Sequence, residues 1–164
     1  MKNPRPPAKK IIQAAVDAAN SSPCAKSKRG VVSFYKEGNA SIILSVGYNR
    51  APDNSCDGSE ECRRDCNKRC THAETVAILD TINTNEGYPI TAQLLHVKTV
   101  DGLLVAGGPP SCWQCSKLAL EAGFSKFWLY EETETSPYGE WKCYSIRDFN
   151  DITMKNCGIY QIKS

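Results

Sequence analysis

Two short motifs, at residues 72–74 and 110–115, set the strongest constraint on how this chain can fold. The first is His72-Ala73-Glu74, and the second is Pro110-Ser111-Cys112-Trp113-Gln114-Cys115. One imidazole and two thiolates form the three-ligand set of a zinc site whose fourth position stays open for water. The fold is therefore expected to bring His72, Cys112 and Cys115 together around one zinc ion.

Glu74 gives this metal site its predicted chemistry. Zinc lowers the pKa of water that it binds toward neutrality. A carboxylate two residues after the histidine can reach that water without binding the metal, so it can take up a proton and deliver it elsewhere. Both motifs also lie where helices are expected to begin, and the partial positive charge of a helix N-terminus favours thiolates. We therefore predict that Glu74 is the general acid and base of the site.

A purely structural interpretation of the same residues is also open. Thr71-His72-Ala73-Glu74 and Ser111-Cys112-Trp113-Gln114 both match the capping box, in which the first and fourth residues bond to each other's backbone at a helix start. Capping explains why helices begin there. It does not explain why an imidazole and a thiol occupy the two helix starts, so the metal interpretation is preferred.

The composition predicts one domain over residues 1–164, because 41% of the residues are hydrophobic and 23% are charged. A net charge of +2 gives no argument for nucleic-acid binding. Gln13 and Asp17 interrupt the apolar segment near the N-terminus, which predicts an amphipathic helix and not a signal peptide. No segment is apolar enough to span a membrane. We therefore expect a cytoplasmic protein. Its nine cysteines are expected to bind metal in preference to forming disulfides.

Hydrophobic periodicity predicts alternating helices and strands. Helices are predicted at about 6–20, 73–82, 112–121 and 145–156, and strands at 31–35, 42–48, 94–100, 127–130 and 159–162. Asp101-Gly102 interrupts the third strand before a short apolar run at 103–105. This order predicts an α/β fold of three α-β-α layers, in which helices cover both faces of a mixed five-stranded sheet.

An insertion at about 51–70 carries a second set of cysteines. Cys56, Cys62, Cys66 and Cys70 lie among charged residues, and the last three recur at every fourth position, on one face of a helix or a tight coil. Four thiolates suit a closed structural zinc site, so a second zinc ion is predicted here. A three-thiolate site with another ligand in place of Cys56 and a set of buried or free cysteines are the alternatives. The remaining cysteines are expected to be small core residues, and they are Cys24, Cys143 and Cys157.

With these motifs the chain resembles the cytidine deaminase superfamily, and within it the deoxycytidylate deaminases. H-x-E followed by C-x-x-C is the zinc signature of such enzymes. The segment 22–32 resembles the one that leads into the family's first strand, and Gly47-Tyr48-Asn49 resembles its G-[YW]-N turn. The resemblance covers about Ile11 to Leu129, and the cysteine-rich insertion is typical of the deoxycytidylate branch. One departure is Ser111, which stands between Pro110 and the first cysteine, where the family usually has proline directly before it.

The resemblance implies a zinc-dependent aminohydrolase that converts a cytosine nucleotide, dCMP, to dUMP with release of ammonia. It also implies a homo-oligomer, to which aromatic residues would contribute contacts, namely Trp128, Tyr130 and Trp141. Asn49 would bond to the sugar or base of the substrate, and a turn residue with positive φ is the alternative for this position.

Other substrate contacts are expected around these motifs. Four basic residues can form a rim that binds the phosphate, namely Lys26, Lys28, Arg29 and Arg50. The alternative is that they form a solvent-exposed face without a binding role. The neighbours of the zinc ligands are expected at the pocket wall, and they are Ala73, Ser111 and Trp113. Trp113 can instead pack beneath its helix.

Three other functions stay open. A deaminase of bases in single-stranded DNA or RNA would use the same zinc chemistry, but the low net charge and the cysteine insertion favour a nucleotide. A deaminase of free nucleosides or bases is the second alternative, although the nucleoside-specific branch usually has cysteine where His72 stands. A non-enzymatic zinc-binding module is the third, and it would not require Glu74.

Overall fold

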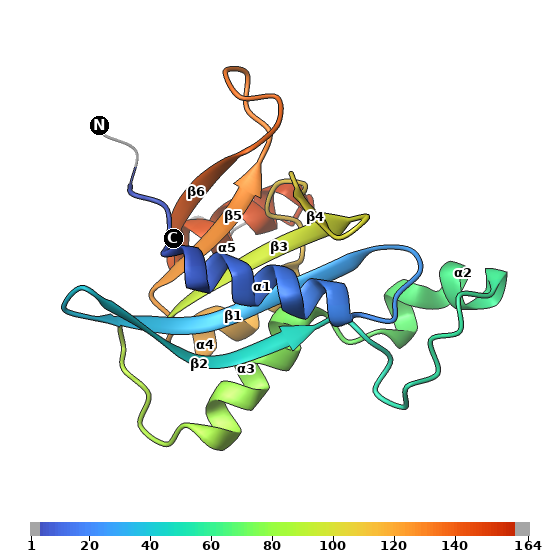
Figure 1. Cartoon of the computed structure of the whole chain (residues 1–164), viewed down its shortest axis with the longest axis horizontal. Helices are drawn as coiled ribbons and strands as arrows, with labels where there is room; N and C mark the ends of the chain where they lie inside the picture. The colour runs from blue at the N-terminus through green and yellow to red at the C-terminus, as the bar shows by residue number, and fades with distance from the viewer. Residues whose placement is uncertain (1–3, 160–164) are drawn as a thin grey trace.

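The computed structural model describes residues 4–159 of the 164-residue chain. A mixed sheet with the strand order β2-β1-β3-β5-β6 forms its centre, and β4 pairs with β3 outside this path (Figure 1). Among the strand pairs within residues 4–159, only β3 and β5 run parallel. The strands are β1 (Lys28–Glu37), β2 (Ala40–Tyr48), β3 (Gln93–Val100), β4 (Leu103–Val105), β5 (Lys126–Glu131) and β6 (Glu140–Ser145).

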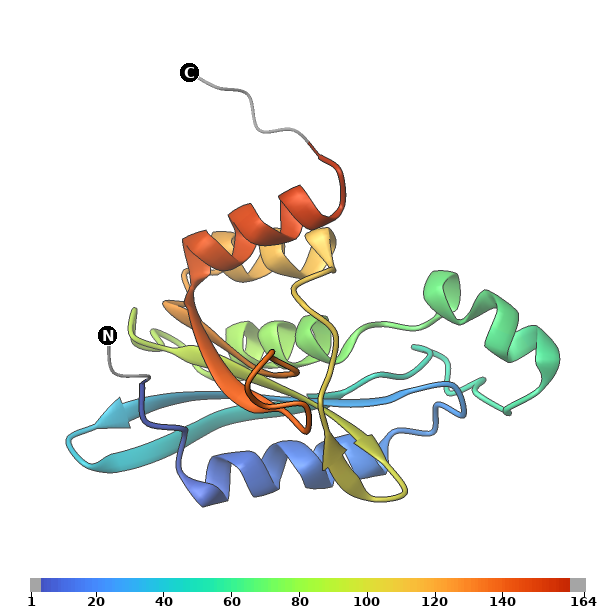
Figure 2. The same cartoon turned by 90° about the horizontal axis from the view of Figure 1, so that it is seen from above.

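Helices cover both faces of this sheet. Helix α1 (Lys9–Ser21) lies on one face, whereas α3 (Ala73–Thr84), α4 (Trp113–Glu121) and α5 (Ile146–Asn156) lie on the other (Figure 2). Helix α2 (Glu60–Arg69) belongs to the cysteine-rich segment and extends away from the three layers. None of the helices between residues 4 and 159 is long and apolar enough to cross a membrane. The predicted three-layer α-β-α fold is confirmed.

Neighbouring residues in the central strands supply the two cores, because successive side chains of a strand point to opposite faces. Val32, Leu95 and Trp128 pack under α1, whereas the preceding residues Val31, Leu94 and Phe127 pack under α3, α4 and α5. Trp128, which we expected at a subunit contact, is only 3% exposed. Its indole N–H donates a 2.8 Å hydrogen bond to Gln93 Oε1, so this side chain belongs to the core.

Two glycines allow the helices to approach the sheet closely. A Cβ atom at Gly30 would lie 2.2 Å from the carbonyl oxygen of Ala15 in α1. A Cβ atom at Gly47 would lie 2.7 Å from the carbonyl oxygen of Ala73 at the start of α3. Any side chain at Gly47 would therefore push away the helix turn that carries Glu74.

The strand assignments differ from expectation near the C-terminus. The hairpin at 31–48, the helices and the 94–100 strand are confirmed, and Asp101 and Gly102 form the left-handed turn between β3 and β4. The fifth strand of the main path is β6, which the sequence did not predict because polar and apolar residues mix in its Glu-Trp-Lys-Cys-Tyr-Ser segment. The closing strand predicted at 159–162 falls mainly outside the described residues, and Ile159 itself is not in a strand.

Candidate functional site

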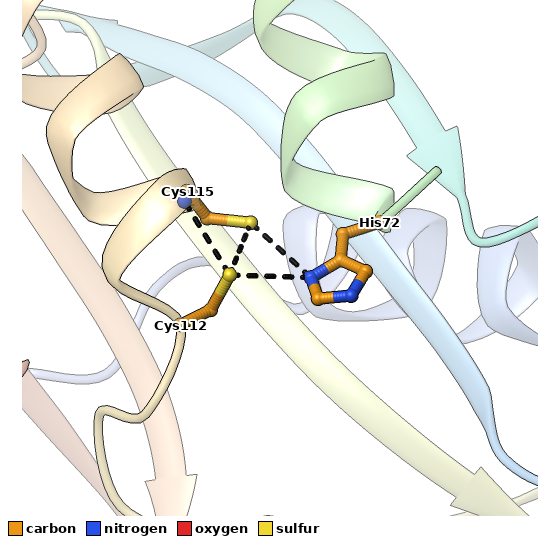
Figure 3. A group of neighbouring side chains, drawn as sticks. All are labelled: His72, Cys112 and Cys115. Atoms are coloured by element: carbon orange, nitrogen blue, oxygen red, sulfur yellow. Dashed lines mark hydrogen bonds between the residues drawn. The ribbon is translucent and has the colours of Figure 1, made fainter. Parts of the chain in front are cut away.

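His72, Cys112 and Cys115 meet at the facing N-termini of α3 and α4 (Figure 3). His72 Nδ1 lies 3.3 Å from Cys112 Sγ and 3.4 Å from Cys115 Sγ, and the two sulfur atoms lie 2.9 Å apart. Within the range 4–159, this is the one set of three or more His, Cys, Asp or Glu ligand atoms that all lie within 4.8 Å of one another. The structure thus brings together the three predicted ligands.

The capping-box interpretation of these residues is wrong. The N-cap of α3 is His72 and not Thr71, and its side chain makes no capping hydrogen bond. The N-cap of α4 is Cys112 and not Ser111, and its sulfur accepts a 3.4 Å hydrogen bond from the backbone N–H of Cys115. Both helices begin one residue later than the boxes require, which places the ligands themselves at the helix starts.

The three groups shift one another's pKa values. The hydrogen bond between the two sulfurs, aided by the one from His72, lowers the pKa of the Cys112 thiol to about 5. The same sulfur contact, together with burial, raises the pKa of Cys115. The contact with Cys112 raises the pKa of His72. A nitrogen and two sulfurs that share protons at this distance are a donor set that suits zinc, since the metal replaces those protons.

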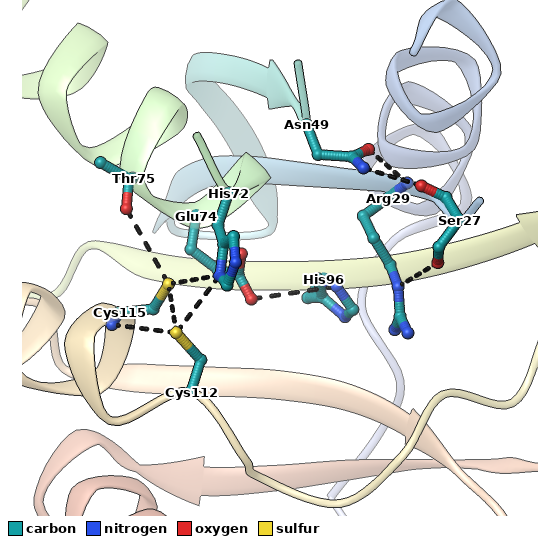
Figure 4. A network of polar contacts seen from close by, with 9 residues as sticks. All are labelled: Ser27, Arg29, Asn49, His72, Glu74, Thr75, His96, Cys112 and Cys115. Carbon is teal, nitrogen blue, oxygen red and sulfur yellow. Dashed lines mark hydrogen bonds and ion pairs between the residues drawn. The ribbon is translucent and has the colours of Figure 1, made fainter. Parts of the chain in front are cut away.

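A cavity of about 350 Å³ opens beside the cluster, which is a size suited to a small ligand. Glu74 and His96 line it next to the ligands, and Arg29 and Ser27 line it farther along (Figure 4). Lys26 also lines the cavity. Arg29 Nε donates a 2.9 Å hydrogen bond to Ser27 Oγ. The two terminal amino groups of Arg29 have no hydrogen-bond or carboxylate partner among the described residues. Burial lowers the pKa of this guanidinium, which still stays charged at neutral pH.

The remaining predicted contact residues divide into two groups. Lys26, Arg29, Asn49, Ala73 and Ser111 line the cavity. Three others do not line it, namely Lys28, Arg50 and Trp113. The Lys28 ammonium donates to the carbonyl of Ser22, and the guanidinium of Arg50 lies 5.3 Å from the centre of the Tyr48 ring. The Trp113 ring is 39% exposed beneath the Lys117 ammonium, so it neither lines the cavity nor packs under its helix.

Asn49 uses its side chain to hold the start of β1. Its Oδ1 accepts a 2.8 Å hydrogen bond from the backbone N–H of Arg29, and its Nδ2 donates a 2.7 Å hydrogen bond to the carbonyl of Ser27. Asn49 does not adopt a positive φ, so the turn interpretation is wrong. These bonds fix the segment that presents Arg29 and Ser27 to the cavity.

His96 is a cavity residue that the sequence analysis missed. It lies in β3, is 8% exposed, and its Nε2 is 3.9 Å from Glu74 Oε1. A signal was present, because His96 is one of only two histidines and stands between the apolar residues Leu95 and Val97 of a predicted strand. The sequence could not show that it faces Glu74.

The second cysteine cluster differs from the predicted set. Sulfur contacts run from Cys24 to Cys66 (3.7 Å), from Cys66 to Cys70 (3.5 Å) and from Cys70 to Cys56 (3.9 Å). Cys62 lies one turn earlier in α2 and has no such sulfur contact within the described part of the chain. Cys24, which is buried as expected, therefore takes the place of Cys62 in the cluster.

The thiols of this cluster differ in acidity. Burial together with the neighbouring thiols raises the pKa of Cys70 to about 12, and burial raises that of Cys66. Burial acts in the same direction on Cys24, but hydrogen bonds to backbone groups of Ser27 and Lys26 outweigh it and lower the pKa. Several thiolates this close repel one another, so a bound cation would be needed to ionise them together.

The end of α5 holds the loop that carries Cys112. Asn156 Nδ2 donates a 2.8 Å hydrogen bond to the carbonyl of Pro110, and Cys157 Sγ lies 3.1 Å from the carbonyl of Ser111. The extra residue Ser111 therefore belongs to a tethered loop. The third cysteine expected in the core, Cys143, is half-buried on β6.

Comparison with solved structures identifies the fold as cytidine deaminase-like. A cytidine deaminase from Burkholderia pseudomallei superimposes with a TM-score of 0.53 at 16% sequence identity, over 88% of this chain and 96% of that one. A dCMP deaminase from the cyanophage S-TIM5, solved in complex with dCMP and dUMP, superimposes with a TM-score of 0.50 at 18% identity, over 94% of this chain and 96% of that one. No protein-family model and no curated protein sequence matches the chain. At these identities the likeness establishes the fold.

Proposed function

We propose that the protein is a zinc-dependent deaminase of a cytosine nucleotide, with dCMP as the substrate and dUMP and ammonia as the products. The observation that carries this proposal is the convergence of His72, Cys112 and Cys115 beside Glu74 in one cavity. The similarity in fold to a cytidine deaminase and to a dCMP deaminase supports it. A zinc-binding module without activity would explain the ligands but not the adjoining carboxylate.

The protein's own groups would divide the work along the cavity. His72 Nδ1 and the sulfurs of Cys112 and Cys115 would hold zinc, which when bound lowers the pKa of water toward neutrality. Glu74 does not belong to the ligand group, so its carboxylate is free to accept a proton from water and to deliver protons to the ring nitrogen and the departing amine. The buried sheet beneath the cavity, including Leu129, limits access of bulk water.

Arg29 supports a phosphorylated substrate. Its terminal amino groups face a cavity without a carboxylate partner in the described chain, and Lys26 lines the same end. A guanidinium offers paired N–H donors that match a phosphate, and partial burial strengthens such charge-assisted hydrogen bonds. The cytosine ring would then lie between this end and the zinc ligands.

The substrate is tested with purified zinc-loaded protein by measuring ammonia release. We expect dCMP to be deaminated with a kcat/KM at least about tenfold above that of deoxycytidine, because one phosphate interaction contributes about 1.5 kcal/mol or more. The panel also contains dCTP, guanine and a cytosine-containing oligonucleotide. Deamination of the oligonucleotide without deamination of dCMP would contradict the proposal and favour a nucleic-acid substrate.

Arg29→Gln separates recognition of the phosphate from the chemistry. The variant should raise the KM for dCMP by roughly 10-fold to 100-fold and leave kcat/KM for deoxycytidine unchanged. Arg50→Gln is the matched control, since this arginine lies outside the cavity and should change neither value. An equal loss on both substrates would show that Arg29 does not read the phosphate.

We propose that the second cysteine cluster holds a structural zinc ion through Cys24, Cys56, Cys66 and Cys70. Cys24→Ser should remove one of about two zinc ions per chain and lower the unfolding temperature, because the metal crosslinks the start of β1 to the insertion. Cys62→Ser should keep both ions. Zinc content by elemental analysis and thermal denaturation measure the two effects, and zinc loss in Cys62→Ser but not in Cys24→Ser would refute this ligand set.

A further inference from the structure

His96 is a buried polar residue without a role in the proposed function. It belongs neither to the zinc ligands nor to the phosphate end of the cavity. It extends from β3 into the cavity floor between Glu74 and Arg29 (Figure 4). Its ring nitrogens make no hydrogen bond to any described residue, and the nearest charged atom is Glu74 Oε1, 3.9 Å from Nε2. Because His96 lines the cavity and the fold does not hold its nitrogens, the imidazole is available to the groups in that cavity.

The surroundings of His96 keep its imidazole neutral. Burial lowers its pKa to about 4, and although Glu74 acts to raise it, Arg29 from β1 and His72 at the start of α3 add to the lowering. A neutral imidazole carries one N–H donor and one bare nitrogen, and a neighbouring carboxylate selects the form whose N–H faces it. Nε2 faces Glu74, so the proton belongs on Nε2.

We infer that His96 is a positioning residue that directs the Glu74 carboxylate through its Nε2–H. The inference rests on the proposed function, in which Glu74 moves the protons. Hydrogen bonds of this kind are often long in a free enzyme and shorten when substrate closes the site, and a 3.9 Å separation lies within about 1 Å of a good bond. The bond would hold one carboxylate oxygen against β3 and leave the other for the reacting water.

His96→Leu tests this role, since leucine fills similar space without a donor. We expect kcat for dCMP to fall roughly 10-fold to 100-fold, because misplacing a reacting group by about 1 Å can cost a factor of that size. KM should stay within about twofold, because a residue that acts through Glu74 affects the chemical step and not the binding of substrate. His96→Gln, which restores an N–H donor, should recover most of kcat.

Two outcomes would overturn the inference. An unchanged kcat in folded His96→Leu would show that His96 only fills space. A raised KM with an unchanged kcat would show that it binds substrate instead of directing Glu74. Val97→Ala is the control for β3 packing, because this buried side chain points to the opposite face and its loss should lower stability without lowering kcat.

A measurement without turnover separates failure of this inference from failure of the proposed function. The protein has only two histidines, so long-range ¹⁵N–¹H NMR of the zinc-loaded wild type can assign the protonated nitrogen of each. We expect the neutral Nε2–H form of His96 at pH 7, and a shift toward Nδ1–H in Glu74→Ala. A wild-type Nδ1–H form would overturn the inference whether or not dCMP is a substrate.

Discussion

Glu74→Gln should keep zinc and lose turnover, with kcat for dCMP lower by about 10³-fold, since a positioned general acid and base contributes about 10²–10⁴-fold. The amide has nearly the shape of the carboxylate but cannot accept the proton. Because Glu74 lies outside the ligand group, metal affinity should be nearly unchanged. Ammonia release and elemental analysis on the same preparation measure the two properties.

The control for this variant is Glu121→Gln. Glu121 ends α4, is exposed, and does not line the cavity, so its substitution should change neither zinc content nor kcat. A fully active Glu74→Gln would refute the assigned mechanism. Loss of zinc in Glu74→Gln would instead place the carboxylate among the ligands, contrary to the geometry.

Cys115→Ser should abolish both zinc binding at the candidate centre and activity. A serine hydroxyl does not ionise near neutral pH and is a poor zinc ligand, whereas the thiolate is a strong one. Bound zinc lowers the barrier of a hydrolysis by several kcal/mol, so its loss should reduce kcat/KM by at least about 10³-fold. Elemental analysis should show one zinc ion fewer per chain than in the wild type.

Cys143→Ser is the control for replacing a cysteine that lies outside the metal centre. Cys143 is half-buried on β6 and belongs to neither cysteine cluster. The variant should retain zinc and activity, and thermal denaturation of both variants identifies any general loss of folding. Wild-type zinc content and kcat in Cys115→Ser would rule out the proposed metal centre.

Much of the fold could be predicted from patterns local in the chain. Adjacent pairs such as Val31 and Val32 are both buried because helices cover both faces of the sheet, and this produces the continuous apolar runs that identified the central strands. Strand β6 escaped prediction because it lies at the sheet edge, where its side chains are only partly buried and the apolar pattern is weak.

The cysteines show the same limit within the site. Spacing at every fourth residue grouped Cys62 with Cys66 and Cys70, because residues at that spacing share a helix face. The structure groups Cys66 and Cys70 with Cys24 instead, from the segment before β1. Spacing describes one helix, whereas this contact joins two segments that are distant in sequence.

By itself, the sequence determined which metal-ligating and acidic side chains are present and where each lies on its helix. An imidazole and two thiols at the starts of two predicted helices, with a carboxylate in the first turn, predict a metal site and a proton carrier. Only the tertiary structure decided what surrounds them. His96 meets Glu74, and Arg29 lies along the same cavity, because β1 and β3 pair antiparallel with Val31 opposite His96 and Arg29 opposite Lys98. That register is set by the packing of α1 and α3 on the two faces, which no spacing within one segment encodes.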